Sequence, residues 1–372
     1  MQVPFNRVEV SSSERQKINQ VLDGKARGVI EDFEEAIEKY TGAQFALATS
    51  HGTSALHLAM LAINLKRGDK VLCSVDAFPS VPEVVRHFDA EPIFIDIDPQ
   101  TYNVDLDKLE TYLADNKSKK LKAVIVSHIA GQCTNLERLY NIAHIYDVKI
   151  IEDAAEALGA TFKGAKIGST GADITCFGFS PHLKNAYSNG GVMVSDDEDI
   201  IERAILLRNH AMVVDEDSLE YIYDIVDIGS KYTISPLDAA YNLEKLKTQD
   251  KNITRQREIA AIYNEQLSGV AHISLPTIND DHACSLYIIK IDKNRDSFAR
   301  ELDAKGIQTG LHYIPLHLMS YYKSKYSLRV NDFPVALQTF QQVLSIPNFA
   351  SMTDKEIKYV CESIKEISKT RV

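Results

Sequence analysis

Residues 149–195, KIIEDAAEALGATFKGAKIGSTGADITCFGFSPHLKNAYSNGGVMVS, decide the fold. They contain three short apolar runs, each of the length of a buried strand: 149–153, 172–177 and 191–195. The first run ends in two carboxylates, of which the second is Asp153. The loop between the other two runs, residues 180–190, holds one lysine, Lys184, and ends in a glycine pair with the residue that follows. The stretch therefore predicts three strands, with an acid at the end of one and a lysine between the other two.

A carboxylate at the carboxyl end of a strand and a lysine on a later turn are the pair that pyridoxal phosphate chemistry requires. Asp153 would keep the pyridine nitrogen protonated, and Lys184 would supply the amine of the Schiff base. Taken alone, the same residues also fit an aspartate that caps a helix and a solvated loop lysine, so the rest of the chain must decide.

Composition and charge narrow the class of protein. The 372 residues are 45% hydrophobic and 25% charged, which is ordinary for a globular protein of one large and one small domain. The net charge of -11 argues against nucleic acid or an anionic membrane as partner. Because we see no signal peptide and no apolar run of roughly 20 residues, we expect a cytoplasmic protein that does not enter a membrane.

The five cysteines are dispersed and show no C-x-x-C spacing. This pattern favours reduced, buried thiols over disulfides or a zinc site, and we expect no metal.

The first half of the chain alternates between strand and helix patterns. Further strands are predicted at 44–49, 70–74, 92–96 and 121–127, and helices between them, one of them opened by a capping box at 134–137. This order predicts an α/β fold with a mostly parallel central sheet and helices on both faces. Since ligands gather at the carboxyl ends of such strands, the polar turn 50–54 and Asp153 should face one crevice. The turn suits a phosphate group, although plain N-capping by Ser50 or Thr53 is the alternative.

The second half has a different pattern. An irregular acidic segment, 213–227, is followed by two long helices at 236–248 and 253–267. Beyond them the order of strands and helices is that of a smaller α+β unit. We therefore predict a large domain over 1–240 and a small C-terminal domain over 241–372.

Six stretches, in this order, resemble one family: PFNRV, SHGTSALHLAM, EDAAEALGA, PHLKNAYSNGG, GSKYTISPLDAA and TGLHYIPLHLMSYY. Together they resemble the DegT-type aminotransferases, which are fold type I, pyridoxal-phosphate-dependent enzymes that mostly make amino sugars. The resemblance runs nearly end to end. It implies pyridoxal phosphate as cofactor and transfer of an amino group as the reaction.

The resemblance assigns roles around the cofactor. Gly52 and Thr53 would hold its phosphate, and Phe78 would stack on its ring. Asp153 would pair with the ring nitrogen, and Glu156 would lie near the ring hydroxyl.

Other matched positions concern the second subunit and the substrate. Lys231 would reach the cofactor phosphate of the partner subunit in a homodimer with shared active sites. His312, Tyr313 and His317 would line the sugar side of the pocket.

The lysine loop departs from the family pattern. Leu183 occupies the usual lysine position, two residues after the proline, and Lys184 follows it. Ser180 stands two residues after the position of the usual phosphate-binding serine. An insertion before the lysine and a deletion after it would restore Lys184 as the nucleophile. Without a usable lysine, His182 could act as the base, as histidine does in related sugar dehydratases.

The resemblance implies glutamate as the amino donor and a nucleotide-linked keto sugar as the acceptor. The product would be an amino sugar for a surface polysaccharide such as lipopolysaccharide. A keto-sugar dehydratase and a catalytically silent regulator or scaffold of the same fold stay open as alternatives.

Overall fold

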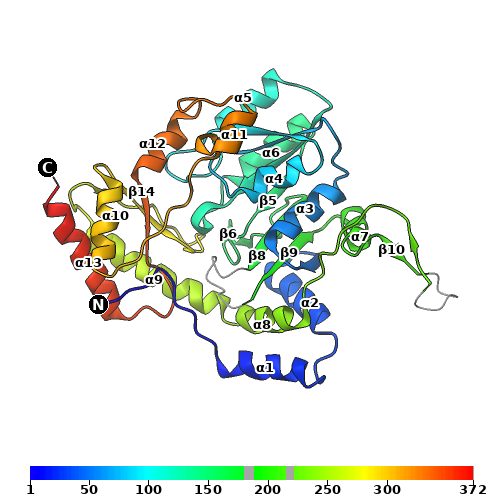
Figure 1. Cartoon of the computed structure of the whole chain (residues 1–372), viewed down its shortest axis with the longest axis horizontal. Coiled ribbons are helices and arrows are strands. Elements are labelled where there is room, and N and C mark those ends of the chain that lie inside the picture. Colours follow the sequence, from blue (N-terminus) through cyan, green and yellow to red (C-terminus); the bar gives the residue numbers. More distant parts are fainter. Residues whose placement is uncertain (180–187, 215–221, 372) are drawn as a thin grey trace.

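The structure is a computed structural model that describes residues 1–179, 188–214 and 222–371 (Figure 1). Its centre is a seven-stranded sheet of order β1-β9-β8-β5-β4-β2-β3. The strands are β1 (Phe45–Thr49), β2 (Lys70–Ser74), β3 (Glu91–Ile95), β4 (Leu121–Ser127), β5 (Lys149–Asp153), β8 (Ile174–Phe179) and β9 (Gly190–Ser195). All run parallel except β9, which is antiparallel to both of its neighbours. The predicted mostly parallel sheet is confirmed, and the short connection from β8 forces β9 to return antiparallel.

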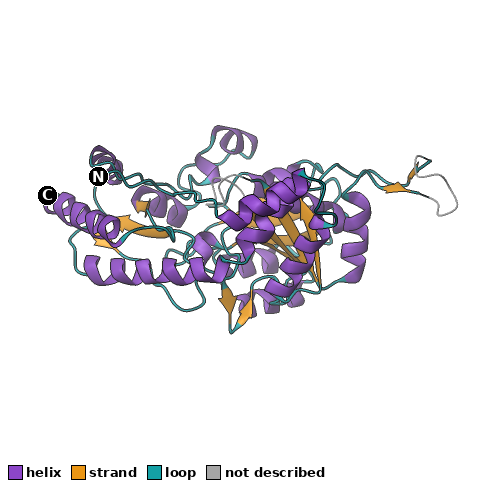
Figure 2. Cartoon of the chain, turned by 90° about the horizontal axis from the view of Figure 1, so that it is seen from below, coloured by secondary structure: helices purple, strands orange, loops and turns teal. Residues whose placement is uncertain are grey.

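Helices cover both faces of the sheet (Figure 2). One face packs against α2 (Val29–Thr41), α5 (Leu106–Asp115), α6 (Leu136–Tyr146) and α8 (Pro236–Leu246). The other face packs against α3 (Gly52–Ala62), α4 (Ser80–Arg86) and α7 (Glu198–Leu207). Helix α1 (Ser12–Leu22) lies against α8. Both faces of the sheet are therefore buried, which explains why the strand sequences are unbroken apolar runs.

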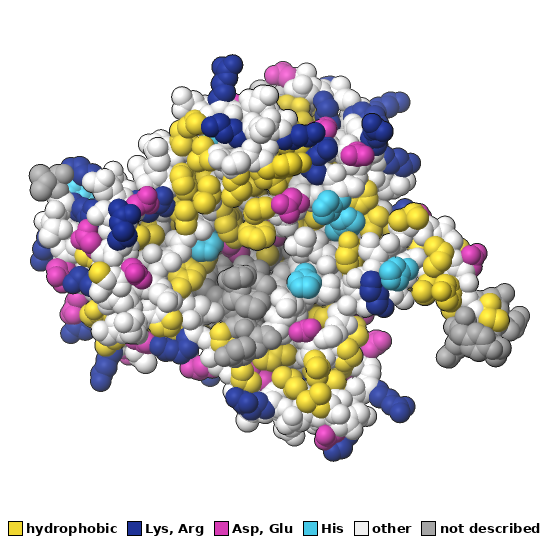
Figure 3. Space-filling view, viewed as in Figure 1, with side chains coloured by type: hydrophobic (Ala, Val, Ile, Leu, Met, Phe, Trp, Pro, Cys, Tyr) yellow, Lys and Arg dark blue, Asp and Glu magenta, His cyan; other side chains and the backbone are white. Residues whose placement is uncertain are grey.

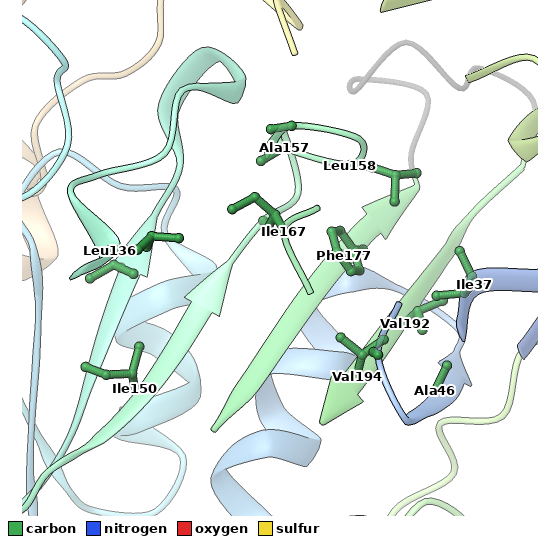
Figure 4. Close-up of a cluster of buried hydrophobic side chains, with 14 of the residues drawn as sticks. Ile37, Ala46, Leu136, Ile150, Ala157, Leu158, Ile167, Phe177, Val192 and Val194 are labelled. Carbon is green, nitrogen blue, oxygen red and sulfur yellow. The ribbon is translucent and has the colours of Figure 1, made fainter. Parts of the chain in front are cut away.

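Side chains alternate between the two cores. Ile150 joins the cluster on the α6 side, whereas Ile151 joins the cluster on the α3 side. Figure 4 shows the first cluster, in which Ile150 lies near Leu136 of α6, while Val194 lies near Ala46 of β1. The same alternation sends Glu152 and Asp153 to opposite faces at the end of β5.

The C-terminal part has its own apolar cluster and its own small sheet. The antiparallel strands β12 (Ile273–Ser274), β13 (Tyr287–Ile291) and β14 (Val343–Ile346) are accompanied by α9 (Gln249–Leu267), α10 (Arg295–Ala304) and α13 (Asp354–Lys369). This arrangement is the predicted α+β pattern.

Two helices were not predicted, α11 (Ser320–Lys325) and α12 (Pro334–Gln342), together with the 3-10 turn η3 (Leu316–Leu318). Leu316, Tyr322 and Ala336 join the apolar cluster on the α3 side of the large sheet, and α12 also contacts β13 of the small sheet. The buried carboxylate of Asp96 fixes α12 by accepting hydrogen bonds from the amides of Val335 and Ala336. Part of segment 241–372 therefore belongs to the core of the large sheet.

Smaller features also differ from the prediction. Asn135, and not Thr134, caps α6, because its side chain accepts the amide of Arg138 at 3.2 Å. Strands β10 (Met212–Val213) and β11 (Asp224–Ile225) pair in the segment predicted to be irregular and project from the body (Figure 1). A hairpin of β6 (Thr161–Phe162) and β7 (Ala165–Lys166) follows β5. Within the described ranges, we find no helix with the length and apolarity needed to cross a membrane.

Candidate active site

A cavity of about 410 Å³ opens at the carboxyl edge of the sheet. The ends of β4, β5 and β8 and the first turn of α3 form its walls, together with Phe78, His312 and Tyr313. Gly52, Thr53 and Asp153 all line it. The two polar features predicted to share one crevice therefore do so.

The first turn of α3 leaves its amides available. His51 precedes the helix in an extended conformation, and no side chain in the described ranges caps the helix start. Ser50 and Ser54 instead bond to each other through their hydroxyls at 3.1 Å. The capping alternative is thus not realised, and the free N–H groups with the helix dipole favour an anion in the cavity.

Close backbone contacts hold this turn in place. A Cβ added to Gly52 would lie 2.9 Å from the Cα of Gly178, and one added to Gly191 would lie 2.3 Å from the carbonyl oxygen of His51. Glycine at 52, 178 and 191 lets β8, β9 and the α3 turn approach each other. This packing forms a narrow cradle beside the free amides.

Asp153 lines the same cavity at the point where β5 ends. Its carboxylate accepts the amide of Ala155 at 3.3 Å and the hydroxyl of Ser127 at 3.4 Å. Burial is the largest influence and raises the pKa of Asp153 above its ordinary value, although the Ala155 amide, His128 and the Ser127 hydroxyl oppose the shift. The carboxylate would therefore gain from a protonated nitrogen placed against it.

Phe78 and Tyr313 form the apolar wall. Phe78 is 53% exposed, which is unusual for a large aromatic residue, and its ring meets that of Tyr313 edge-on at 5.9 Å. The Tyr313 hydroxyl donates to Glu156, whose carboxylate also accepts the amide of Ala130. Burial and the Glu156 charge keep the pKa of Tyr313 well above its ordinary value, so it stays a neutral phenol. An exposed, flat ring is what a stacked planar ligand needs.

The two histidines predicted to line the sugar side of the pocket lie in different places. His312 lines the cavity, stacks on Phe5 at 5.8 Å and pairs with the Ser345 hydroxyl at 2.8 Å. His317 instead is fully buried in η3, where its ring packs on Phe333 and Nε2 lies 3.1 Å from the carbonyl oxygen of Val330. The geometry therefore gives His317 a packing role outside the cavity, because η3 turns its side chain toward α12.

The remaining predicted residues lie elsewhere. Lys231 is exposed, outside the residues that line the cavity, and donates to the Asn209 side chain at 2.8 Å. Ser180, His182 and Lys184 fall outside the described residues. Phe179 and Asn189, on either side of that gap, both line the cavity.

Comparisons with known proteins agree with this geometry. The model of the DegT/DnrJ/EryC1/StrS aminotransferase family matches residues 9–365. The chain belongs to this family. It is thus a pyridoxal-phosphate-dependent aminotransferase of fold type I, as its motifs predicted.

Similar proteins match over nearly the whole length of this aminotransferase. SpsC of Bacillus subtilis, a spore coat polysaccharide biosynthesis protein, is 30% identical over 99% of this chain and 97% of its own. GDP-perosamine synthase of Escherichia coli O157:H7 is 28% identical over 98% of both chains. The crystal structure of DesV from S. venezuelae matches with a TM-score of 0.87 at 26% identity, covering 96% of this chain and 95% of DesV.

A second cavity of about 490 Å³ adjoins the first in this aminotransferase. The two share Ala155, Glu156, Gly178 and His312. Its other walls come mainly from the N-terminal segment 6–14, from polar residues of α8 and α9, and from residues 349–351. A larger open groove, lined by Lys117 and Lys119 among others, lies away from the predicted site residues.

Among the residues of the aminotransferase site that sequence reasoning missed is His128. It follows directly after β4, lines the cavity and is only 1% exposed. The rule that ligands gather at strand ends could have found it, because residues 127 and 128 end the strand beside that of Asp153.

Proposed function

We propose that this aminotransferase moves an amino group from an amino acid, glutamate in the first instance, to a keto sugar carried on a nucleotide. The observation that carries the proposal is one cavity that joins a carboxylate, a stacking ring and uncapped helix amides, with a polar chamber beside it. The polysaccharide role of SpsC and the name GDP-perosamine synthase support a sugar acceptor, and the second also supports a nucleotide carrier.

The residues present fit pyridoxal phosphate. The glycine cradle and the free amides at Gly52 and Thr53 would hold the phosphate, and Phe78 would cover the ring. Asp153, which lines the same cavity, would receive the ring nitrogen. When bound, the cofactor supplies an aldehyde that carries the amino group and a ring that accepts electrons from the reacting carbon.

The protein side chains would then handle charge and protons. Asp153 would keep a proton on the ring nitrogen. Lys184 would take the proton from the α-carbon of the amino donor and return a proton in the second half of the reaction. Tyr313, held neutral by Glu156, would close the wall beside the ring and exclude water.

The working unit is proposed to be a homodimer with shared active sites. The ribbon of β10 and β11 and the residues that flank it are apolar and exposed: Met212, Val213, Val214, Ile222, Tyr223, Ile225, Val226 and Ile228. Apolar side chains along this projecting ribbon are visible in Figure 3. A two-stranded ribbon is marginal by itself, so packing on a second copy would stabilise it. Lys231 lies beside this ribbon, in a bridge with Asn209, and could reach the partner's cofactor.

Because the cysteines are free, four of them buried, a reducing compartment suits the chain, and the cytoplasmic location stays a prediction.

The test is an absorption spectrum of the protein with pyridoxal phosphate, followed by borohydride reduction and peptide mapping. We expect the covalent adduct on Lys184, its loss in Lys184→Ala, and no change in the control Lys119→Ala. Glutamate should then change the spectrum, and a panel of nucleotide-linked keto sugars should reverse that change. Bound cofactor without an adduct would favour the dehydratase alternative, and no response to any sugar would overturn the proposed acceptor.

A further inference from the structure

Strand β1 forms one edge of the central sheet and ends just before residues 50–53, which we call the phosphate turn. In the described part of the chain β1 pairs with β9 and with no other strand, so its outward amides need partners from elsewhere. Helix α2 packs along this edge, and Ile37 and Ala46 belong to one apolar cluster (Figure 4). Side chains of α2 can therefore reach the outer edge of the strand.

Two glutamates of α2 bind the outward amides of β1. Glu38 accepts the amide of Ala46 at 2.9 Å, and Glu34 accepts the amide of Ala48 at 2.7 Å. Residues four apart on a helix are separated by about 6 Å along its axis. Residues two apart on a strand are separated by about 6.8 Å. The two spacings are similar, so one helix can supply an acceptor to both amides.

Glu34 differs from Glu38 because it also takes part in an ion pair. The guanidinium of Arg208, at the C-terminal cap of α7, bonds to the Glu34 carboxylate and donates to the carbonyl oxygen of Ala48 at 3.0 Å. The Arg208 and Glu34 side chains are only 18% and 15% exposed, so solvent screens this pair less than a surface pair. Within the described ranges Glu38 forms no such pair. One ion pair therefore fixes both the amide and the carbonyl group of Ala48.

Arg208 is also connected to the phosphate turn through its backbone. Its carbonyl oxygen accepts the amide of Tyr232 at 3.0 Å, and the carbonyl oxygen of Tyr232 accepts the amide of Ser50 at 2.7 Å. The Tyr232 hydroxyl lies 3.1 Å from Nδ1 of His57, which belongs to α3. The position of Arg208 thus determines the positions of Ala48, just before the turn, and of Ser50, its first residue.

We propose that Glu34 and Arg208 are positioning residues for the cofactor phosphate: their ion pair fixes the start of the phosphate turn and so sets where the free amides of α3 meet the phosphate. Neither side chain lines the cavity, so both act through the backbone. Hydrogen bonds to a charged group depend strongly on distance and angle, so a small shift of the turn weakens them. The inference rests on the proposed function of this turn as the phosphate site.

The first experiment measures amide hydrogen exchange of the full chain without cofactor, in Glu34→Ala and in the matched control Glu38→Ala. Each change leaves one amide of β1 without its acceptor, so both variants should lose thermal stability. Only Glu34→Ala should speed exchange of the Ser50 amide, by about tenfold, because only this change releases Arg208. Glu34 does not touch that amide itself, so equal exchange of Ser50 in the two variants would overturn the inference.

The second experiment measures binding of pyridoxamine phosphate and of pyridoxamine, which lacks the phosphate; neither probe can form the covalent link to a lysine. We expect affinity for pyridoxamine phosphate to fall about tenfold in Glu34→Ala and Arg208→Lys, as the loss of one hydrogen bond to a charged group implies. Lysine keeps the charge but lacks the planar fork that reaches both Glu34 and Ala48. Affinity for pyridoxamine should stay unchanged, and Glu38→Ala should bind both probes like the unchanged protein.

The two probes separate a role in positioning the turn from general damage to the fold. Glu34→Gln keeps an acceptor for the Ala48 amide, so its affinity for pyridoxamine phosphate should lie between those of Glu34→Ala and the unchanged protein. An equal loss of affinity for both probes in Glu34→Ala would show a merely structural role, and the inference would fail. If the unchanged protein does not prefer pyridoxamine phosphate to pyridoxamine, the proposed function of the turn fails, whereas the exchange of Ser50 still decides whether Glu34 fixes the turn.

Discussion

At the scale of single residues, Asp153 ends β5 with its carboxylate facing the cavity and with only neutral hydrogen-bond donors, Ala155 and Ser127, among the described residues. Asp153→Asn keeps the shape but cannot hold a proton on a ring nitrogen. We expect the rate with glutamate to fall by a factor on the order of 10² to 10⁴, the usual range for a lost proton-transfer or charge-stabilising group. Single-turnover absorption changes measure it, with Asp147→Asn, at the left-handed cap of α6, as the matched control.

A second residue, Asp76, makes stability depend on pH. Its carboxylate is buried, and one oxygen has no hydrogen-bond partner in the described ranges. Burial is the main cause that raises its pKa to about 7, with the Tyr313 amide opposing and Glu156 and Asp96 adding. Between the ordinary pKa of an aspartate and pH 7, the folded state then binds more protons than the unfolded state. The free energy of unfolding should therefore fall as pH rises through this window.

Replacing Asp76 by Asn should remove that dependence, which amounts to at most about 1.4 kcal/mol per pH unit. Relative to the unchanged protein, the free energy of unfolding of the variant should therefore increase as pH is raised from 5 to 7. Urea unfolding at several pH values measures it, and Asp280→Asn, an exposed acid, is the control. An unchanged pH profile in Asp76→Asn would contradict the argument.

At the scale of elements, the cradle depends on how closely β9 approaches the first turn of α3. A methyl group at Gly191 would meet the His51 carbonyl at 2.3 Å, and both partners are backbone that cannot rotate away. Gly191→Ala should therefore destabilise the fold by about 1–3 kcal/mol, as overpacking does, and should also weaken cofactor binding. Thermal unfolding and a binding isotherm test both effects.

The control is Gly68→Ala. Its added methyl group meets nothing within 4 Å, but its φ of 78° is costly for alanine. It should lose about 1–2 kcal/mol of stability and keep the affinity for the cofactor. Equal affinity loss in both glycine variants would argue against a specific role for the cradle.

The same elements show what the sequence could predict. The runs that became β4 and β5 are continuous and apolar, so their burial and parallel pairing followed from composition and order. His317 could not be placed in this way, because its motif is local while its burial depends on Phe333 and α12, which are close only in the folded chain. His128 could have been found from its place at the end of a strand, but its approach to Glu152 could not, since Glu152 lies 24 residues away in sequence, on the neighbouring strand.

At the scale of the whole molecule, the proposed homodimer with shared sites can be tested by combining two variants in one dimer. Lys231 lies outside the residues that line the cavity of its own chain, so its proposed contact with the cofactor requires the site of a partner. Lys231→Ala and Asp153→Asn should each be inactive as homodimers. In a heterodimer of the two, one site has both defects, while the other combines an intact Asp153 with an intact Lys231.

Random reassortment of equal amounts gives half heterodimers, each with one restored site, so about 25% of the original activity should return, as two-fold symmetry requires. Assay of the unpurified mixture measures this value, and double purification through two affinity tags isolates the heterodimer alone, which should show about 50% of the original activity because one of its two sites is restored. As a control, either variant is mixed with Lys119→Ala instead. That mixture should show only the activity of the sites that carry no defect, so it distinguishes complementation from dilution. A heterodimer with no restored activity would mean that Lys231 does not complete the site across the interface, and the ribbon of β10 and β11 would then need a different partner.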